Sequence, residues 1–416
     1  MNSSVLIQSA LLHDINHPLN GQRVNILVEN GVISQISTSP ISAPENVKVI
    51  EGNDLFVSGG WFDAYSFLPD PGEPWKETVE TFCLAAAAGG FTEVAALCGT
   101  DPLPEKPAVI ESLIQKSQAQ KVKLHPLGLA SEHAEGKEMA EVYELSQAGS
   151  IGVTDGMMGG ATLSLRSRLM QYCQSLNIPY LQMAYNPKLV TNAEVHEGEL
   201  SVNLGLKGIP TASETVEVLA SIEIAKWLDV PLIVLGVSSK ESVEIIKNAK
   251  AAGLRISAVV PALNLYGTDQ LVGEFDSNFK VLPPLRTEED RKALVQGLVD
   301  GVIDGICANH TPEDVENKKL EFNYARFGAA TYDALSHILL SGKTEQEMSA
   351  ILHSLTYGNR KLYGLNVPKI EAGEKVNLTV FQKGNFELDQ PQSKAYNVIF
   401  KGQNLDYRII DTLLDK

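Results

Sequence analysis

The chain has 416 residues, of which 44% are apolar and 20% charged, proportions that are ordinary for a globular protein. Its length suffices for one large domain and a smaller one. The formal net charge of −17 argues against a nucleic-acid or anionic-membrane partner, because both require basic surfaces. No apolar run reaches the ~18 residues of a membrane span.

The four cysteines, Cys83, Cys98, Cys173 and Cys307, are isolated in the sequence, and most lie in apolar contexts. We therefore expect buried free thiols rather than disulfides or a zinc site. The N-terminus lacks the basic start and the long apolar core of a signal peptide. These features together predict a cytoplasmic protein.

Residues 1–56 show short strand patterns separated by turn residues, and they are too few to bury a good core alone. The sequence Glu29-Asn30-Gly31 indicates a hairpin, because Asn-Gly accepts the positive φ angles of a type I′ turn. Short strand patterns return near the C-terminus, at 376–381, 397–400 and 407–410. We predict that residues 1–56 and 366–416 together form one small β-sandwich domain.

Strand and helix patterns alternate through residues 57–365. The predicted strands span 61–67, 92–97, 122–129, 151–155, 180–185, 232–238, 255–261 and 305–310, and the predicted helices span 76–88, 107–118, 137–147, 162–175, 214–227, 242–252 and 288–299. Several of these strands are continuous apolar runs, as expected where both faces of a sheet are covered. Eight units fit a (β/α)₈ barrel of TIM type, and a doubly wound open sheet is the alternative. The count of eight and the split terminal domain favour the barrel.

In such barrels the chemistry lies at the C-terminal ends of the strands. The framework around these ends resembles the dihydroorotases of the amidohydrolase superfamily, of the type found with aspartate carbamoyltransferase. The resemblance covers nearly the whole chain. It rests on AAAAGGFTEV (85–94), HEGELSVNLGLKGIPTASET (196–215), VSSKESVEIIKNAKAAG (237–253), LPPLR (282–286), DGVIDGI (300–306) and ARFGAATYDAL (325–335).

The chemistry-bearing positions depart from that family. Its strand-one pattern D-x-H-x-H-x-R-E-P-G reads D-A-Y-S-F-L-P-D-P-G here, so the two metal-binding histidines fall on Tyr65 and Phe67. The family's substrate-binding arginine and asparagine fall on Pro69 and Gly99. The family's histidines at strands five and six fall on Met183 and Gly236, and its paired histidines after strand seven fall on Ala262 and Leu263. The aspartate that serves the family as metal ligand and general base falls on Asn309.

These replacements remove the donors that a catalytic zinc ion requires, which are about three imidazole, thiolate or carboxylate ligands. Phe67 and Gly236 have no side-chain donor atom, and the Met183 thioether suits copper(I) better than zinc. The Tyr65 phenol, with a reference pKa of about 10, would have to ionise. Asn309 cannot accept a proton from water. We therefore expect no catalytic residues, no metal and no cofactor, although the resembled family uses zinc.

Four polar residues are candidates for a remnant site: Asp63, Asp155, Asn309 and His310. His310 could bind a carboxylate or amide ligand, or it could form a hydrogen bond to the next loop. We favour the hydrogen bond, because the sequence shows no acidic or metal partner for this histidine. Asp155 is either a remnant of the site or the cap of the following turn or helix. We expect Asp63 to hold loop amides rather than to act as a base.

Tyr65, Phe67, Met183, Ala262 and Leu263 either fill the emptied metal cavity or line a new apolar pocket, and we favour filling because protein interiors are closely packed. Cys98 and Cys307 lie at or near strand ends without a convincing base, which favours simple burial. The glycine-rich stretch Gly156–Gly160 lacks the G-K-[ST] of a phosphate loop, so we interpret it as a flexible loop.

Two functional hypotheses follow. The first is a metal-free, non-catalytic dihydroorotase-like protein of pyrimidine biosynthesis. The resemblance implies that it acts as a structural partner of aspartate carbamoyltransferase, and we expect a homo-oligomer. The second is an active dihydroorotase, or another cyclic-amide hydrolase, that uses unconventional ligands such as Asp63, Asp155 and His310. A metal-free binding protein with a repurposed mouth is a third, weaker hypothesis.

Overall fold

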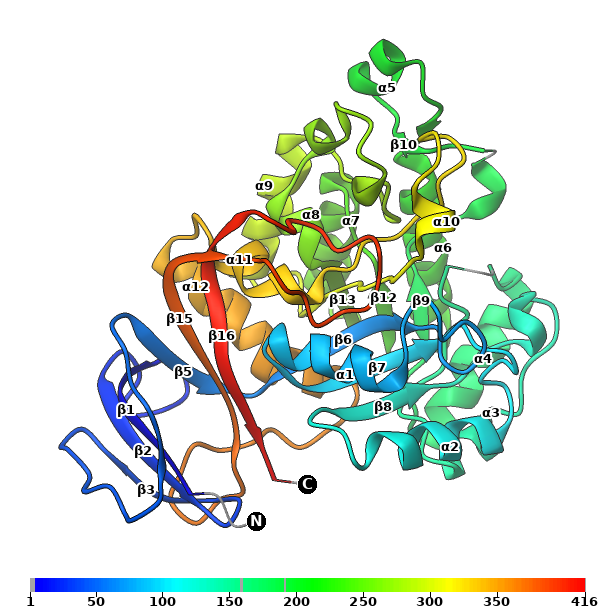
Figure 1. The fold of residues 1–416 in the computed structure, drawn as a ribbon. Coiled ribbons are helices and arrows are strands. Elements are labelled where there is room, and N and C mark those ends of the chain that lie inside the picture. Colours follow the sequence, from blue (N-terminus) through cyan, green and yellow to red (C-terminus); the bar gives the residue numbers. More distant parts are fainter. Residues whose placement is uncertain (1–3, 158–159, 191, 416) are drawn as a thin grey trace.

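A computed structural model describes residues 4–157, 160–190 and 192–415 of the chain. Figure 1 shows a β/α barrel beside a strand-rich part in which the blue N-terminal and red C-terminal segments lie together. No helix among these residues is both long enough and apolar enough to cross a bilayer. Cys83, Cys173 and Cys307 are buried, as expected, whereas the side chain of Cys98 lies outside the described part.

The two termini build one seven-stranded sheet with the order β16-β15-β5-β1-β2-β3, in which β4 pairs with β1. Its strands are β1 (Val5–Leu12), β2 (Arg23–Glu29), β3 (Val32–Ser37), β4 (Lys48–Ile50), β5 (Leu55–Gly59), β15 (Asn377–Glu387) and β16 (Asn404–Leu414). Ile7 and Ile26 share one apolar core with Leu378 and Val380. Strands from both termini therefore lie in one continuous sheet.

Local sequence explains how this sheet turns and where it meets the barrel. Asn30 and Gly31 connect β2 to β3 with φ angles of 53° and 77°, which confirms the predicted hairpin. β5 runs through Gly59 and therefore lies across the boundary expected at residue 56. The first barrel strand starts at Trp61, so the chain passes from sheet to barrel within two residues.

The barrel wall consists, within the described residues, of two parallel sheets and a single linking residue. The strands are β6 (Trp61–Leu68), β7 (Phe91–Cys98), β8 (Lys123–Leu127), β9 (Leu181–Met183), β12 (Leu232–Leu235), β13 (Ile256–Pro261) and β14 (Gly305–Cys307). Val153 bridges Gly128 on one side and Tyr180 on the other. A hydrogen bond of 2.9 Å from the Phe67 N–H to the His310 carbonyl closes the ring. The closed barrel is thus confirmed over the open sheet.

The fourth strand, predicted over 151–155, is reduced to the isolated bridges of Val153. Pro126 and Pro179 lie in the two segments beside it, and neither proline has an N–H to donate. The ladder on each side is therefore too short to form a regular strand, although the chain still completes the wall at this point.

Helices cover the outside of the barrel (Figure 1). They are α1 (Val79–Ala88), α2 (Pro107–Ser117), α3 (Val142–Gln147), α4 (Leu163–Leu176), α6 (Ala212–Leu228), α7 (Lys240–Ala251), α8 (Ala262–Tyr266), α9 (Glu288–Val299), α11 (Leu335–Leu340), α12 (Glu345–His353) and α13 (Asn359–Leu362). Short elements within the loops are β10 (Val195–His196), α5 (Glu199–Leu204), β11 (Gly208–Ile209) and α10 (Val315–Lys318).

Two predicted helices begin later than expected. α1 starts at Val79 rather than residue 76, because Thr78 and Thr81 form a reciprocal capping box that sets its N-terminus. α3 starts at Val142 rather than residue 137, because Met139 pairs with Ser131 in an extended bridge. In both places hydrogen bonds formed by the surrounding chain replace the first helical turn.

The predicted strand 397–400 is wrong. Residues 388–403 form a long connection between β15 and β16, here called the cover loop, in which Val398 makes only an isolated bridge to Ala330. Phe400 has a φ of 60°, which interrupts the extended backbone. The cover loop leaves the terminal sheet and lies against loops at the C-terminal end of the barrel, where it becomes part of the candidate site.

Candidate functional site

The interior of the barrel mouth is filled by side chains from several strands. Tyr65 from β6, Met183 from β9 and Cys307 from β14 are buried in one apolar cluster together with Leu97 and Leu235. Such a cluster across the strands is the ordinary packed core of a β/α barrel. Ala262 and Leu263 do not belong to this cluster. They pack with the apolar residues outside the wall, contrary to the expectation that they converge on the mouth.

Two glycines at the mouth leave space that larger side chains fill. A Cβ atom placed on Gly99 would lie 1.7 Å from Cζ of Phe67, so the phenyl ring occupies the space beside that glycine. A Cβ atom on Gly236 would lie 2.8 Å from Sδ of Met183, and Gly236 has a φ of 75°. The space above strands two and six is therefore taken up by Phe67 and Met183. This arrangement supports filling rather than a new pocket at these positions.

The residues at the mouth do not fit a zinc site. Burial raises the pKa of Tyr65, which keeps the phenol protonated and unsuited to bind a metal. Phe67 and Gly236 provide no donor, as the sequence already indicates. In the described part of the chain, no three histidine, cysteine, aspartate or glutamate residues come together in a way that could hold a metal ion.

Asp63 lies on β6, completely buried, and both of its carboxylate oxygens are engaged. Oδ1 accepts hydrogen bonds from the backbone N–H groups of Ala308 (2.8 Å) and Tyr65 (3.2 Å). Oδ2 accepts from the hydroxyl groups of Ser66 (2.5 Å) and Tyr332 (2.8 Å). Burial raises the pKa of Asp63 to about 6, against the opposing effect of these donors. Asp63 therefore ties β6 to β14, in agreement with its expected role as a holder of loop amides.

Asp155 follows the short fourth strand and binds the preceding loop. Its Oδ1 accepts from the N–H groups of Ala130 (3.0 Å) and Ser131 (2.8 Å), and its Oδ2 accepts from the Ser131 hydroxyl (2.7 Å). Burial raises the pKa of this carboxyl group. Asp155 thus caps the turn after β8 rather than the turn or helix that follows it, which corrects the expected direction of the cap. The related stretch Gly156–Gly160 is only partly described, because Met158 and Gly159 lie outside the described residues.

Asn309 and His310, at the end of β14, point in different directions. The Asn309 amide donates a 3.1 Å hydrogen bond to the Leu282 carbonyl, and its backbone has a φ of 49°. The His310 ring is completely buried and stacks on Tyr332, with a centroid separation of 4.2 Å. The N–H of Thr331 donates to Nδ1 of His310 at 3.0 Å, so this nitrogen carries no proton and Nε2 does.

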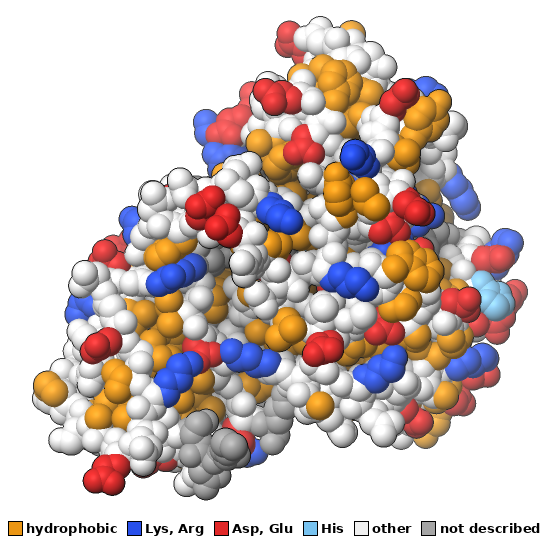
Figure 2. Space-filling view, in the orientation of Figure 1, with side chains coloured by type: hydrophobic (Ala, Val, Ile, Leu, Met, Phe, Trp, Pro, Cys, Tyr) orange, Lys and Arg blue, Asp and Glu red, His pale blue; other side chains and the backbone are white. Residues whose placement is uncertain are grey.

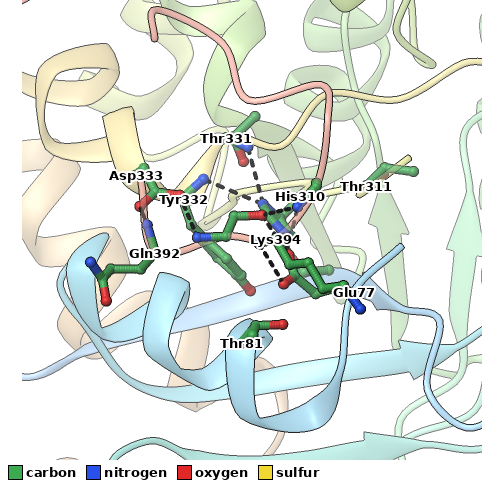
Figure 3. Close-up of polar contacts among 12 residues, drawn as sticks. Glu77, Thr81, His310, Thr311, Thr331, Tyr332, Asp333, Gln392 and Lys394 are labelled. Carbon is green, nitrogen blue, oxygen red and sulfur yellow. Dashed lines mark hydrogen bonds and ion pairs between the residues drawn. The ribbon is translucent and has the colours of Figure 1, made fainter. Parts of the chain in front are cut away.

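The expected hydrogen bond from His310 to the next loop is present, but the histidine also has an acidic partner. Nε2 of His310 lies 3.4 Å from Oε2 of Glu77, and both side chains are fully buried (Figure 3). Ser393 and Lys394 of the cover loop donate to Glu77 through a hydroxyl (2.5 Å) and a backbone N–H (3.0 Å). Burial acts to raise the pKa of Glu77, but the hydrogen bonds from His310, Ser393 and Thr81 outweigh it and lower that pKa.

Sequence reasoning missed Glu77, because the prediction placed it in the first turn of the helix at 76–88. The only local signal is its position just before the Thr78 cap, which leaves its side chain free to turn inward. The Glu77–His310 pair lies between α1, the 331–333 turn and the cover loop, as Figure 3 shows. Asp63 and His310 share the neighbours Ser66 and Tyr332, whereas Asp155 has separate partners. The four candidates therefore form no single ligand set.

The overall structure belongs to a known class of barrels. The L-hydantoinase (dihydropyrimidinase) of Arthrobacter aurescens superposes with a TM-score of 0.84 and 19% identity, over 100% of this chain and 95% of that one. A D-hydantoinase (dihydropyrimidinase) of a Thermus species gives a TM-score of 0.76 and 18% identity, over 99% and 94%. At these identities the likeness shows the fold alone, and it supports the TIM-type barrel.

Sequence comparison then identifies the family. Residues 56–253 match the model of the Dihydro-orotase-like family. A dihydroorotase of Acetivibrio thermocellus is 30% identical, over 94% of this chain and 93% of that protein. A dihydroorotase of Carboxydothermus hydrogenoformans is 33% identical, over 86% and 84%. The chain belongs to the dihydroorotase family.

Proposed function

We propose that this protein is a metal-free, non-catalytic member of the dihydroorotase family that serves pyrimidine biosynthesis as a structural partner of aspartate carbamoyltransferase. The observation that supports the loss of activity is the packing of the mouth. Phe67 lies against Gly99 and Met183 against Gly236, at positions where the resembled dihydroorotases place groups for metal and substrate. Side chains without suitable donors thus occupy the volume of the reaction centre.

The remaining polar groups do not replace the missing chemistry. Asp63, Asp155 and His310 each use their acceptor atoms on neighbouring protein donors, so a metal would have to displace hydrogen bonds that hold the strand ends. Asn309 is an amide and cannot serve as a general base. Opening a cyclic amide without a metal would require attack by water with a pKa of about 15.7. These features weigh against the alternative of an active cyclic-amide hydrolase with unconventional ligands.

The role as a partner of aspartate carbamoyltransferase rests on the resemblance to the dihydroorotases found with that enzyme. A non-catalytic barrel retains its outer surfaces, and those surfaces can still hold another subunit in place. The hydrogen-bonded strand ends and the anchored cover loop would keep such a scaffold rigid without a bound metal or substrate.

Metal analysis and a turnover assay test the loss of activity. The purified chain, incubated with excess zinc and then desalted, should retain far less than one zinc per chain. It should neither hydrolyse dihydroorotate nor cyclise carbamoyl-aspartate above the background rate. A catalytically active dihydroorotase relative carried through the same steps serves as the positive control. Stoichiometric zinc together with turnover would overturn the proposal and establish the alternative.

Co-purification tests the partner. The tagged chain, co-expressed with the aspartate carbamoyltransferase of the same organism, should elute with it in one complex by size-exclusion chromatography with light scattering. Removal of the tagged chain should lower the oligomeric state of the transcarbamoylase. If the two proteins elute separately at micromolar concentration, the structural role is wrong even if the chain is inactive.

A further inference from the structure

A groove lies at the end of the barrel opposite the filled mouth. Its volume is about 550 Å³, which is within the range of small-molecule sites. It reaches Ser257 at the start of β13 and Asp304 just before β14, and helices α9, α12 and α13 line its sides. Ile15, in the connection between β1 and β2, also lines the groove and is 50% exposed. The groove is therefore formed jointly by the barrel and by the N-terminal segment.

Part of the groove wall is apolar. The apolar side chains that line it are Ile15, Leu298, Val299, Ile303, Ala350 and Leu362. Leu298 and Ile303 also belong to the main apolar core of the barrel, so their positions are fixed by packing. A hydrocarbon ligand would remove water from this preformed surface without a large rearrangement of the chain.

Two polar side chains of the groove have unused capacity for hydrogen bonds. Lys361 is exposed, and its ammonium group forms no ion pair within the described part of the chain. Nδ1 of His353 is buried and has no hydrogen-bond partner among the same residues. The imidazole ring stacks on Tyr357 with a centroid separation of 5.1 Å, which holds it in place. Burial lowers the pKa of His353, and the charge of Lys361 lowers it further, against the opposing effect of Asp14. Lys361 and His353 therefore lie within electrostatic reach of each other.

The carboxylates near the groove already have partners. Among the described residues that line the groove, Asp304 is the acidic one, and its Oδ2 accepts from Lys250 at 2.7 Å and from the N–H of Ala258 at 2.8 Å. Asp14 lines a smaller neighbouring cavity instead, and its oxygens accept from the Tyr357 hydroxyl at 2.7 Å and 2.6 Å. The unpaired charge of the groove is therefore positive, in a chain whose net charge is −17.

The backbone between these two polar groups departs from a regular helix. Residues Ser354–Gly358 form a π-helical turn, a rare conformation that recurs at functional sites. Gly358 lines the groove, and a Cβ atom on it would overlap the carbonyl oxygen of Asp304. The turn that separates His353 from Lys361 therefore packs closely against the segment before β14.

We propose that the groove binds a free monocarboxylic acid with an apolar chain, such as a medium-chain aliphatic acid. Its carboxylate would accept hydrogen bonds from the Lys361 ammonium group and from the His353 ring, and charge-assisted bonds of this kind are stronger than neutral ones. Its chain would lie against Leu298 and Ile303. A basic ligand would instead meet an unpaired ammonium group. The inference does not depend on whether the barrel mouth is catalytic.

Calorimetric titration of the full chain with sodium octanoate tests this site. One octanoate per chain should bind with a dissociation constant of about 0.1–1 mM, as expected for a ligand of this size. The titration stays below the concentration at which octanoate forms micelles. Octan-1-ol has the same apolar chain without the charge, and at about 1 mM it should give no resolved heat of binding, because it cannot pair with Lys361.

Substitution of the polar groups separates a specific site from non-specific adsorption. Lys361→Gln should weaken the binding of octanoate about tenfold, because the charged donor is lost. His353→Phe retains a ring that can stack on Tyr357 and should also weaken binding. Lys247→Gln, at an exposed lysine of α7 outside the groove, is the matched control and should leave the affinity unchanged. Both lysines are exposed, so neither lysine variant should have a lower melting temperature.

Proton NMR locates the bound acid. The Cε1–H resonance of His353, assigned by its loss in His353→Phe, should shift as octanoate is added, whereas that of the exposed His133 should not. Ala350→Phe places a ring in the groove and should abolish binding. The proposal is wrong if octanoate does not bind at about 5 mM, if octan-1-ol binds as tightly, or if Lys361→Gln keeps the wild-type affinity. An unchanged His353 resonance in the presence of bound octanoate would place the acid elsewhere and would overturn it as well.

Discussion

At the scale of single residues, the charged groups at the barrel mouth hold strands instead of performing chemistry. Asp63 receives four donors and joins β6 to β14, and Asp155 receives three donors and fixes the turn after β8. A buried carboxylate that is fully hydrogen-bonded is a structural element, because removal of its partners would leave an unsatisfied charge in a dry environment. His310 and Glu77 satisfy each other in the same way.

The first prediction concerns Asp63→Asn. Burial raises the pKa of Asp63 from 3.8 to about 6, so between these pH values the folded state binds more protons than the unfolded state. The free energy of unfolding should therefore fall as the pH rises from 4 to 6, by about 3 kcal/mol from this group. Asparagine cannot ionise, keeps one acceptor for the two N–H groups, and should remove that slope.

Melting temperatures measured from pH 4 to 7 check this prediction. The control is Asp54→Asn at an exposed turn, which should preserve the wild-type slope. If Asp63→Asn and the wild type show the same dependence on pH, the carboxyl group of Asp63 is not the one that titrates in this range.

At the scale of elements, the buried side chain of Asn397 is one of the anchors of the cover loop, beside the hydrogen bonds of Ser393 and Lys394 to Glu77. The Asn397 carbonyl oxygen Oδ1 accepts from the N–H of Glu313 at 2.9 Å, and its Nδ2 donates to the Thr311 carbonyl at 3.0 Å. Its backbone carbonyl accepts from the N–H of Ala330 at 3.1 Å. These bonds join the loop between β15 and β16 to the segment that follows β14. The terminal sheet and the barrel mouth are thereby connected through the cover loop.

The second prediction is that Asn397→Ala loosens the cover loop. The substitution leaves the Glu313 N–H and the Thr311 carbonyl without partners, at a cost of about 1–3 kcal/mol for each group. Amide hydrogen exchange should become faster across 388–403 and 311–313, and exchange in β12 and β13 should remain slow. Gln392→Ala, at an exposed side chain of the same loop, should leave exchange unchanged. Equal protection in both variants would show that other contacts hold the loop.

At the scale of the whole molecule, one buried network connects the barrel to the terminal sheet. Arg360 of α13 pairs with Glu93 of β7 at 2.8 Å and donates to the Gly60 carbonyl at 2.8 Å. Glu93 also contacts His125 of β8 at 2.8 Å and accepts from Asn377 of β15 at 3.0 Å. The network lies where β7 and β8 begin, at the end of the barrel opposite the mouth, and such positions serve stability.

The third prediction is that Arg360→Met destabilises the whole protein by about 3–5 kcal/mol, because Glu93 loses its buried cation. The double variant Arg360→Met with Glu93→Gln should recover part of this loss. Burial acts to raise the pKa of Glu93, but His125 and Arg360 outweigh it and hold that pKa well below its ordinary value. The stability from Glu93 is therefore present at neutral pH and is lost as the pH falls.

Thermal unfolding at pH 7 and pH 4 measures both effects. Lys123→Met, at an exposed lysine on β8, is the control and should change the melting temperature little. If Arg360→Met has the same melting temperature as the wild type, the barrel and the sheet are held together by apolar packing alone.

Figure 2 shows acidic, basic and apolar side chains intermixed on the face that includes the cover loop, as is usual for a protein surface.

The sequence by itself determined those features that depend on a few neighbouring residues. The eight alternating strand and helix patterns predicted the barrel, and Asn30-Gly31 predicted the β2–β3 hairpin of the terminal sheet, because φ angles and side-chain spacing are local properties. The chemistry of each strand end was also readable, since a phenylalanine or a glycine has no donor in any fold. The sequence did not predict that the fourth strand is reduced to isolated bridges. That outcome depends on which segments lie beside it in the fold and on the prolines that they carry.

Only the tertiary structure decided which buried groups meet. Glu77 and His310 are separated by 233 residues in sequence, and Asp155 binds a loop 24 and 25 residues earlier. The ion pairs that Glu217 and Glu214 of α6 form with Arg166 and Arg286 likewise join residues that are far apart in the sequence. Partners of this kind are selected by packing and by the need to satisfy buried charge, and neither is encoded in the local pattern of the chain.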